Sequence, residues 1–266
     1  MARAGAIVAR RPGSVNHSSH DLPGFCAKRF AYDTGAMLRD ETAFQISDEC
    51  AELGLVVGVL MLRDVAIAES PAALRRSIQS SSDEVRRRFS GVAAIREAPE
   101  VQAFRRIYEA VGVNPNRHAP ACQRLLEMVW KKGDLPSINT LVDLYNVVSI
   151  EGLLSLGAHD LGEVALPIHL RIASRDESFT PLGSHGGHDV RRGEFAYFDA
   201  RQRVVCRLDL VQADFSKITA RTSGAVLIVE GTRVHDRQAF EKASNALMKL
   251  AADYCGGTAD VVSWPF

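Results

Sequence analysis

The sequence lacks an excess of charge of either sign. Its 266 residues carry 32 basic and 32 acidic side chains, so the formal net charge at pH 7 is zero. Such a balance creates no global field that would draw the protein onto nucleic acid or an anionic membrane. We therefore expect no DNA or membrane partner, and any contact with RNA has to come from a local basic patch.

Paired cysteines and long apolar runs are also missing. The five cysteines are scattered, odd in number and never spaced as C-x-x-C, which argues against both a disulfide framework and a zinc site. The longest strongly apolar run, residues 53–62, is far shorter than the roughly 20 residues that cross a bilayer. These absences favour a cytoplasmic protein without a metal or cofactor.

Several common catalytic motifs are absent as well. The chain has no G-x-S-x-G, no G-x-G-x-x-G after a strand, no P-loop and no H-E-x-x-H, which argues against serine hydrolases, nucleotide-binding enzymes and zinc proteases. His185 and His188 are three residues apart, a spacing that a metal can use, but they lie in a glycine-rich stretch without an obvious third ligand. We interpret that stretch as a solvated loop.

The first 36 residues differ in composition from the rest. Arginines stand there among Gly, Ser, Asn, His and Pro, with little periodic apolar pattern, and residues 6–9 are too short for the apolar part of a secretory signal. We expect a flexible arm over residues 1–36, with a transit peptide as the weaker alternative and Met37 as an alternative start. A single domain is predicted over residues 37–266.

Hydrophobic periodicity predicts helices in the first half of that domain and strands in the second. A β-branched run predicts a buried strand over 55–62. Helices are predicted over 70–89 with Ser70 as N-cap, 100–111, 121–132, 138–150 and 240–254. Strands are predicted over 164–173, 194–198, 204–210 and 225–229. This order favours an α+β fold over a regular βαβ alternation.

The segment 138–150 is the most informative. Apolar residues cover most of its circumference, so the helix should be largely buried. Asn139, Asp143 and Asn146 are spaced i, i+4, i+7 and fall on one narrow stripe. The stripe either faces water or forms a hydrogen-bonded network that lines a cavity. The residues alone leave both alternatives open.

Other polar residues stand at predicted strand ends, where ligand-binding groups tend to collect. Glu194 begins a strand after a glycine and either binds substrate or satisfies loop amides. Thr222 and Glu230 bracket the last predicted strand. His159 and Asp160 either join the network of the buried helix or form a structural pair.

Several motifs, taken in order, resemble a known family. They are LPSINTLVDLYNVVS, the Asp160 position, GEFAYFD and ITARTSGAVLIVEG. Together they resemble the editing domain of the phenylalanyl-tRNA synthetase β subunit, the B-three/B-four domain, and especially its free-standing relatives. The similarity runs from about Met37 to the C-terminus. It implies a layered α+β fold of mixed sheets packed with helices.

The resemblance implies a trans-acting aminoacyl-tRNA deacylase, a hydrolase in which a positioned water cleaves the ester of mischarged tRNA without a metal or a covalent nucleophile. The implied partner is aminoacyl-tRNA, bound weakly and transiently. The alternatives are a non-catalytic tRNA- or aminoacyl-binding module on the same fold, and a small-molecule hydrolase or binder. The amino acid, the tRNA and the oligomeric state are left open.

The resemblance also suggests roles for individual residues. Asn146, Thr222 and Glu230 fall on motif positions that line the family's pocket, whereas Gly157 stands where the synthetase domain has a histidine. The catalytic residues expected are Asn139, Asn146 and His159. The expected substrate-binding residues are Asp143, Asp160, Glu194, Thr222 and Glu230. The expected tRNA-binding residues are Arg86, Arg87, Arg105, Arg106, Lys131 and Lys132.

Overall fold

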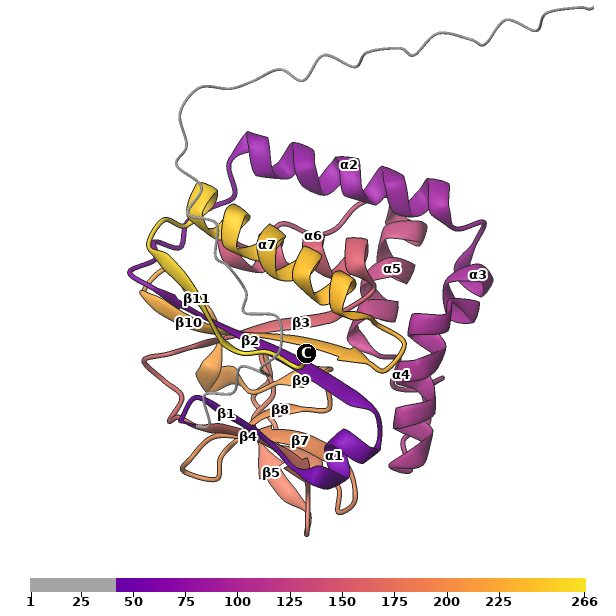
Figure 1. Cartoon of the computed structure of the whole chain (residues 1–266), viewed down its shortest axis with the longest axis vertical. Coiled ribbons are helices and arrows are strands. Elements are labelled where there is room, and N and C mark those ends of the chain that lie inside the picture. Colours follow the sequence, from indigo (N-terminus) through magenta and orange to yellow (C-terminus); the bar gives the residue numbers. More distant parts are fainter. Residues whose placement is uncertain (1–41) are drawn as a thin grey trace, which may run out of the picture. The chain divides into compact units, whose positions relative to one another are not determined.

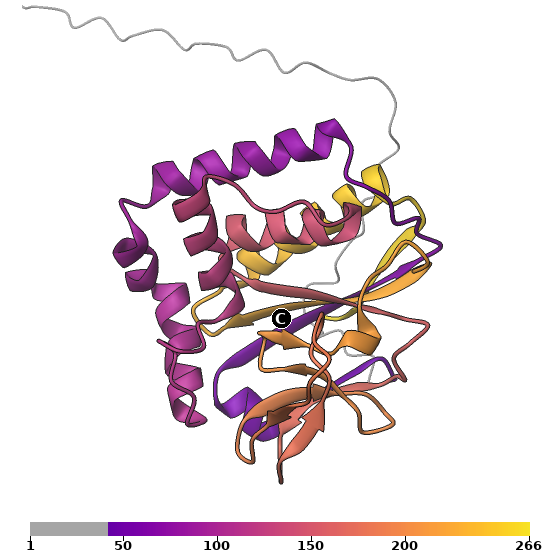
Figure 2. The same ribbon diagram turned by 180° about the vertical axis from the view of Figure 1, so that it is seen from behind.

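The computed structural model describes residues 42–266, and the arm predicted for residues 1–36 lies outside the described residues. Within that range the fold is α+β, as predicted: helices cover one face of a four-stranded sheet and a five-stranded sheet lies against the other (Figure 1, Figure 2). The division into an arm and a single domain over residues 37–266 stays a prediction.

The four-stranded sheet is antiparallel, in the order β11-β2-β10-β3. Its strands are β2 (Leu55–Arg63), β3 (Ser155–Asp160), β10 (Gly224–Thr232) and β11 (Thr258–Ser263). Along β10 the buried side chains alternate between two hydrophobic clusters. Leu227 and Val229 pack with the helices, whereas Val226 and Ile228 pack with the five-stranded sheet. Because both faces are covered, the central strands are nearly continuous apolar runs.

The five-stranded sheet is mixed, in the order β1-β4-β7-β8-β9. Its first pair is parallel and the others are antiparallel. Its strands are β1 (Phe44–Ile46), β4 (Ile168–Ile172), β7 (Phe195–Phe198), β8 (Val204–Arg207) and β9 (Val211–Gln212). A two-stranded sheet pairs β5 (Glu177–Phe179) with β6 (His188–Val190).

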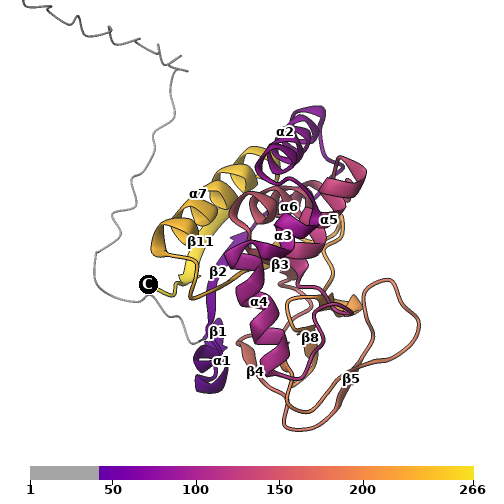
Figure 3. The same cartoon turned by 90° about the vertical axis from the view of Figure 1, so that its right-hand side faces the viewer.

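Figure 3 shows α2, α5, α6 and α7 together on the side of the four-stranded sheet away from β1, β4 and β5. The helices are α1 (Asp48–Glu52), α2 (Ala72–Arg88), α3 (Val92–Glu97), α4 (Pro99–Ala110), α5 (Ala121–Lys132), α6 (Thr140–Gly152) and α7 (Arg237–Tyr254), with a short 3-10 turn at Asp214–Ser216. In the part of the chain that the structure describes, no helix is both long and apolar enough to cross a bilayer.

The helix predicted over 240–254 begins earlier, at Arg237. Two other predicted helix starts are wrong for related reasons. Pro71, not Ser70, is the N-cap of α2, because the Ser70 hydroxyl donates instead to Asp143 at 2.6 Å. The helix predicted from Ile138 begins at Thr140, because Asn139 is its N-cap and its side-chain oxygen accepts a hydrogen bond from the Val142 amide at 3.0 Å. In both cases a short polar side chain makes a hydrogen bond that periodicity does not reveal.

Candidate functional site

A cavity of about 420 Å³ lies where α5, α6, β3 and the turn between β8 and β9 meet. Asn146 lines it from α6, and Gly157 and His159 line it from β3. Asp209 and Gln212 line it from the turn and from β9. We refer to this space as the Asn146 cavity, and it joins an amide, an imidazole and a carboxylate from distant parts of the chain.

Local geometry explains why α6 and β3 lie next to each other. Leu153 adopts a left-handed conformation with φ 55° at the end of α6, and β3 begins two residues later. The tight connection keeps the helix and the strand together. Gly157 and His159 are two residues apart on β3, so they face the same side of the sheet.

His159 is buried and electrically neutral. Its side chain is 3% exposed, and its Nδ1 lies 3.0 Å from Ser216 Oγ and 3.3 Å from Gln212 Nε2. Burial lowers the pKa of the imidazole from 6.5 to about 4, so the ring carries no charge at pH 7. These two neighbours engage Nδ1 of the ring.

The low pKa of His159 predicts a loss of stability in acid. The unfolded chain takes up the proton near pH 6.5 and the folded chain only near pH 4, so the stabilising contribution is complete above pH 6.5 and is lost between those values. The shift corresponds to about 3 kcal/mol of unfolding free energy. Urea unfolding of the wild type and of His159→Gln at pH 7 and pH 4.5 tests this. The variant should lose less stability in acid than the wild type.

The matched control is the exposed His185, whose replacement by glutamine should leave the acid-dependent loss unchanged. If His159→Gln keeps the full wild-type difference between the two pH values, His159 does not titrate with the low pKa described above.

Asp209 anchors one wall of the cavity, and the sequence analysis missed it. Its Oδ1 accepts a hydrogen bond from the Tyr108 hydroxyl, and its Oδ2 accepts from Ser155 Oγ at 2.5 Å and from the Ala121 amide at 3.0 Å. Ala121 is the first residue of α5, where the helix dipole favours a negative charge. The one signal in the sequence was a lone carboxylate between Leu208 and Leu210.

Cys206 also lines the cavity, but its thiol is not an activated nucleophile. Burial raises the pKa of this thiol, and the nearby charge of Asp209 raises it further. The side chain is therefore protonated at neutral pH, whereas a thiolate is the reactive form.

Glu230 lies close to this site and is buried. It is 1% exposed and accepts a hydrogen bond from the Tyr197 hydroxyl. Burial raises its pKa well above the usual range, and the charge of Asp209 raises it further. Glu230 is not among the residues that line the Asn146 cavity.

The polar stripe predicted from Asn139, Asp143 and Asn146 does not act as one group: the first two residues hold the start of α6, and the third lines the cavity. Asp143 accepts hydrogen bonds from Ser70 Oγ and Ser137 Oγ at 2.6 Å each and from the Ile138 amide at 2.7 Å. With Asn139 as the N-cap, Asp143 fixes the segment that enters the helix. Neither side chain lines the Asn146 cavity, which receives only the last member of the stripe.

The remaining predicted substrate-binding residues lie elsewhere. Thr222 Oγ1 donates to Asp160 Oδ2 at 2.5 Å, which joins the end of β3 to the loop before β10. Glu194 forms a buried pair with Arg207, with contacts of 2.6 Å to both Nε and Nη2. That pair lines a different cavity.

The predicted tRNA-binding side chains are spread over three helices. Arg86 and Arg87 are exposed near the end of α2, where Arg87 pairs with Glu84. Arg105 and the exposed Arg106 belong to α4. At the end of α5, Lys132 is exposed and Lys131 pairs with Glu127. Of these side chains, Arg105 lines a cavity that adjoins the Asn146 cavity.

No metal-binding cluster of three or more His, Cys, Asp or Glu side chains occurs among residues 42–266. His185 and His188 belong to the β5–β6 hairpin, and the His188 ring packs edge-on against Phe179. The polar side chains that line the Asn146 cavity include the amide of Asn146, the neutral imidazole of His159 and the carboxylate of Asp209.

Gly157 leaves open space in the wall of the cavity. A Cβ atom built at this position meets no atom within 4 Å. Gly157→Ala should therefore fold normally, with an unfolding free energy unchanged or raised by about 0.5–1 kcal/mol because a strand glycine loses more entropy on folding. Urea unfolding measures this.

Gly231 on β10 is the matched control for Gly157. A Cβ there would lie 2.9 Å from side-chain atoms of Leu154 and Phe240, so Gly231→Ala should be destabilised by about 1–3 kcal/mol. If Gly157→Ala lowers the unfolding free energy as much as Gly231→Ala does, the space beside Gly157 is not open.

The comparison with protein families identifies one family. The sequence pattern of the B3/4 domain matches residues 103–256, which include the Asn146 cavity. Among solved structures, an N-terminal fragment of the phenylalanyl-tRNA synthetase β subunit from Pyrococcus horikoshii is similar, with 11% identity and a TM-score of 0.42 over 84% of this chain and 52% of the fragment. This chain thus spans about half the length of that fragment. No curated protein matches the chain.

Proposed function

The chain belongs to the B3/4 domain family, and from this premise we propose that it is a trans-acting aminoacyl-tRNA deacylase. The observation that carries the proposal is the Asn146 cavity. Its volume of about 420 Å³ is typical of a small-molecule site, and it presents Asn146 and His159 without an activated nucleophile. This combination suits the hydrolysis of an ester that is already activated.

The proposed reaction depends mainly on holding a water molecule and a hydrogen-bond donor close to the ester carbonyl group. A water held about 3–3.5 Å from the ester carbonyl carbon adds to it, and the carbonyl oxygen takes the negative charge. Asn146 donates a hydrogen bond to this oxyanion, and the neutral His159 orients the water through Nε2. The bond to the ribose oxygen then breaks, and that oxygen takes the proton released by the water. The products are a free amino acid and a tRNA with a free terminal hydroxyl.

The open space beside Gly157 gives room for the amino-acid side chain. Because Gly157 and His159 face the same side of β3, a side chain bound there would lie next to the reacting carbonyl. The size of this space would set which aminoacyl groups fit.

The test is a deacylation screen with purified full-length protein and a panel of mischarged tRNAs. Loss of at least one amino acid faster than in buffer supports the proposal. If every tRNA in the panel stays as charged as in buffer, the protein is not a deacylase for these substrates.

A second candidate is a non-catalytic module that binds aminoacyl-tRNA. It is favoured by the weakness of the bases in the cavity, since the pKa of His159 is about 4 and the oxygens of Asp209 already accept three hydrogen bonds. Saturable binding of aminoacyl-tRNA without any loss of the ester would identify this function.

A further inference from the structure

Two residues that line one cavity near the site each carry a buried nitrogen atom without a hydrogen-bond partner among residues 42–266. Arg207 is 5% exposed, and its Nε and Nη2 donate to Glu194 at 2.6 Å, but no atom of residues 42–266 accepts a hydrogen bond from its Nη1. His188 Nε2 is unpaired in the same described range. Both residues line a cavity of about 520 Å³, here called the anion cavity. A buried donor without an acceptor destabilises the fold, and a guanidinium nitrogen can only donate.

The charges around the anion cavity favour a negative ligand. The two carboxylates that line it, Glu194 and Asp189, are already within ion-pair distance of Arg207 and Arg191. Arg117 lines it too, and no carboxylate of residues 42–266 lies within 4 Å of its guanidinium. An anion bound here would accept a hydrogen bond from Arg207 Nη1 and balance the charge of Arg117.

A third space, here called the middle cavity, joins the anion cavity to the Asn146 cavity. Its volume is about 600 Å³, and it has lining residues in common with each of the other two. The shared residues are Arg117, His118 and His188 on the anion side, and Arg124, Leu210 and Val211 on the Asn146 side. The middle cavity therefore adjoins each of the other two.

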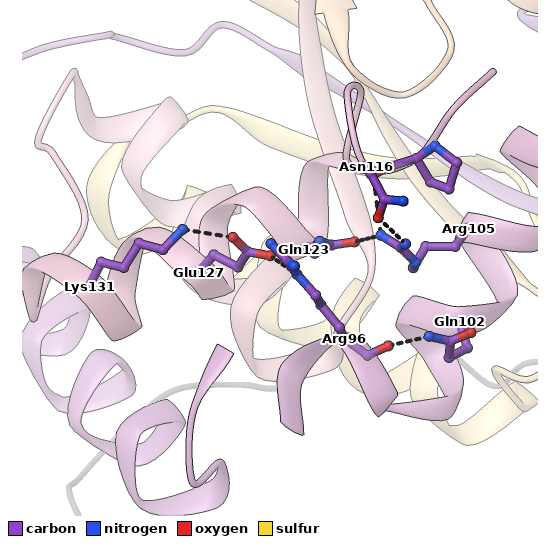
Figure 4. Close-up of polar contacts among 8 residues, drawn as sticks. Arg96, Gln102, Arg105, Asn116, Gln123, Glu127 and Lys131 are labelled. Carbon is purple, nitrogen blue, oxygen red and sulfur yellow. Dashed lines mark hydrogen bonds and ion pairs between the residues drawn. The ribbon is translucent and has the colours of Figure 1, made fainter. Parts of the chain in front are cut away.

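The wall of the middle cavity is basic and held in place by hydrogen bonds (Figure 4). Arg105 donates to Asn116 Oδ1 at 2.7 Å and to Gln123 Oε1 at 3.2 Å, so its partners are neutral and its charge is not cancelled. Arg96 lies 2.8 Å from Glu127, the one carboxylate residue that lines this cavity. The arginines that line it are Arg96, Arg105, Arg117 and Arg124.

We propose that the three cavities form one path for an RNA strand, with the esterified end in the Asn146 cavity and a backbone phosphate against Arg207 Nη1 in the anion cavity. The inference rests on the proposed function, because it takes the Asn146 cavity as the place of the ester. Guanidinium groups recognise phosphate oxygens by paired, charge-assisted hydrogen bonds. A flexible single strand can follow adjoining cavities, and its phosphates supply the anion that the path requires.

The test measures binding of a labelled single-stranded RNA oligonucleotide that ends in CCA, the end common to tRNAs, by fluorescence anisotropy at several salt concentrations. The full-length double variant Arg117→Gln/Arg124→Gln should raise Kd about tenfold or more. Loss of two phosphate contacts should also reduce the slope of log K against log salt by about 1.4. The matched control, Arg201→Gln/Lys242→Gln, removes the same charge at exposed sites elsewhere and should bind like the wild type.

Arg207→Lys tests the anion cavity itself. A lysine keeps the positive charge beside Glu194 but removes the Nη1 donor, so affinity should fall several-fold while the circular dichroism spectrum stays native. Inorganic phosphate should compete with the RNA for the wild type more strongly than for Arg207→Lys. Equal competition in both proteins would mean that the Nη1 donor does not hold a phosphate.

Several outcomes overturn the path. One is that the Arg117→Gln/Arg124→Gln variant binds the RNA with wild-type affinity. Another is that the charge-matched control loses as much affinity as this variant. The third is that the wild type shows no salt-dependent binding of the RNA. Failure of the proposed function is a separate result. If aminoacyl-tRNA is hydrolysed but kcat/KM is indifferent to Arg117 and Arg124, only the path fails. If RNA binding depends on these arginines but no ester is cleaved, the path stands and the deacylase proposal fails.

Discussion

Asn146→Ala is expected to lower kcat/KM for aminoacyl-tRNA hydrolysis by about 10²–10³-fold, the usual cost of removing one oxyanion donor. The Asn146 side chain lines the cavity and is half-buried, so its truncation should leave the fold intact. Single-turnover deacylation of the best substrate from the screen measures the effect. Asn146→Asp should be as inactive, because a carboxylate cannot donate the hydrogen bond.

Asn139 provides a matched comparison on the same helix. Its side chain caps α6, so Asn139→Ala should lower the unfolding free energy by about 1 kcal/mol and leave deacylation at 25 °C close to the wild-type rate. An Asn146→Ala protein with wild-type activity would remove Asn146 from the reaction. Equal losses of deacylation activity in Asn139→Ala and Asn146→Ala would indicate damage to the helix instead of a catalytic role for Asn146.

The elements were largely predictable from the sequence because their periodicity is local. The helix over 121–132 has the predicted bounds, since Gly133 with φ 87° ends it in a conformation that favours glycine. The strand predicted over 55–62 extends by one residue as β2. The start of α6 was misplaced because Asn139 fits two patterns, a polar stripe and an N-cap, and periodicity alone does not distinguish them.

The candidate site was less predictable, because it depends on which distant segments meet. Asn146 and His159 were candidates since a polar group on a buried element needs a partner or a ligand. Asp209 gave only the weak signal of a carboxylate between two leucines, and its partners Tyr108 and Ser155 are 101 and 54 residues away in the chain. The motif resemblance predicted the family, and the match to the B3/4 domain confirms it.

Asp209→Ala is expected to produce the largest loss of stability, about 3–5 kcal/mol of unfolding free energy, because it leaves several buried donors without an acceptor. Those donors are the hydroxyls of Tyr108 and Ser155 and the amide of Ala121. Urea unfolding of the full-length protein measures the loss. Asp209→Asn should lose less, since its amide oxygen still accepts.

A double-mutant cycle shows whether this loss comes from the hydrogen bonds. Tyr108→Phe should destabilise the wild type, but in the Asp209→Ala background it should cost little or nothing, because the Tyr108 hydroxyl there no longer has its partner. If the losses of unfolding free energy in the two single variants simply add in the double variant, the loss in Asp209→Ala does not come from its hydrogen bond with Tyr108. Since the same carboxylate fixes the first turn of α5 and a residue of β3, the stability of the fold and the shape of the Asn146 cavity depend on one group.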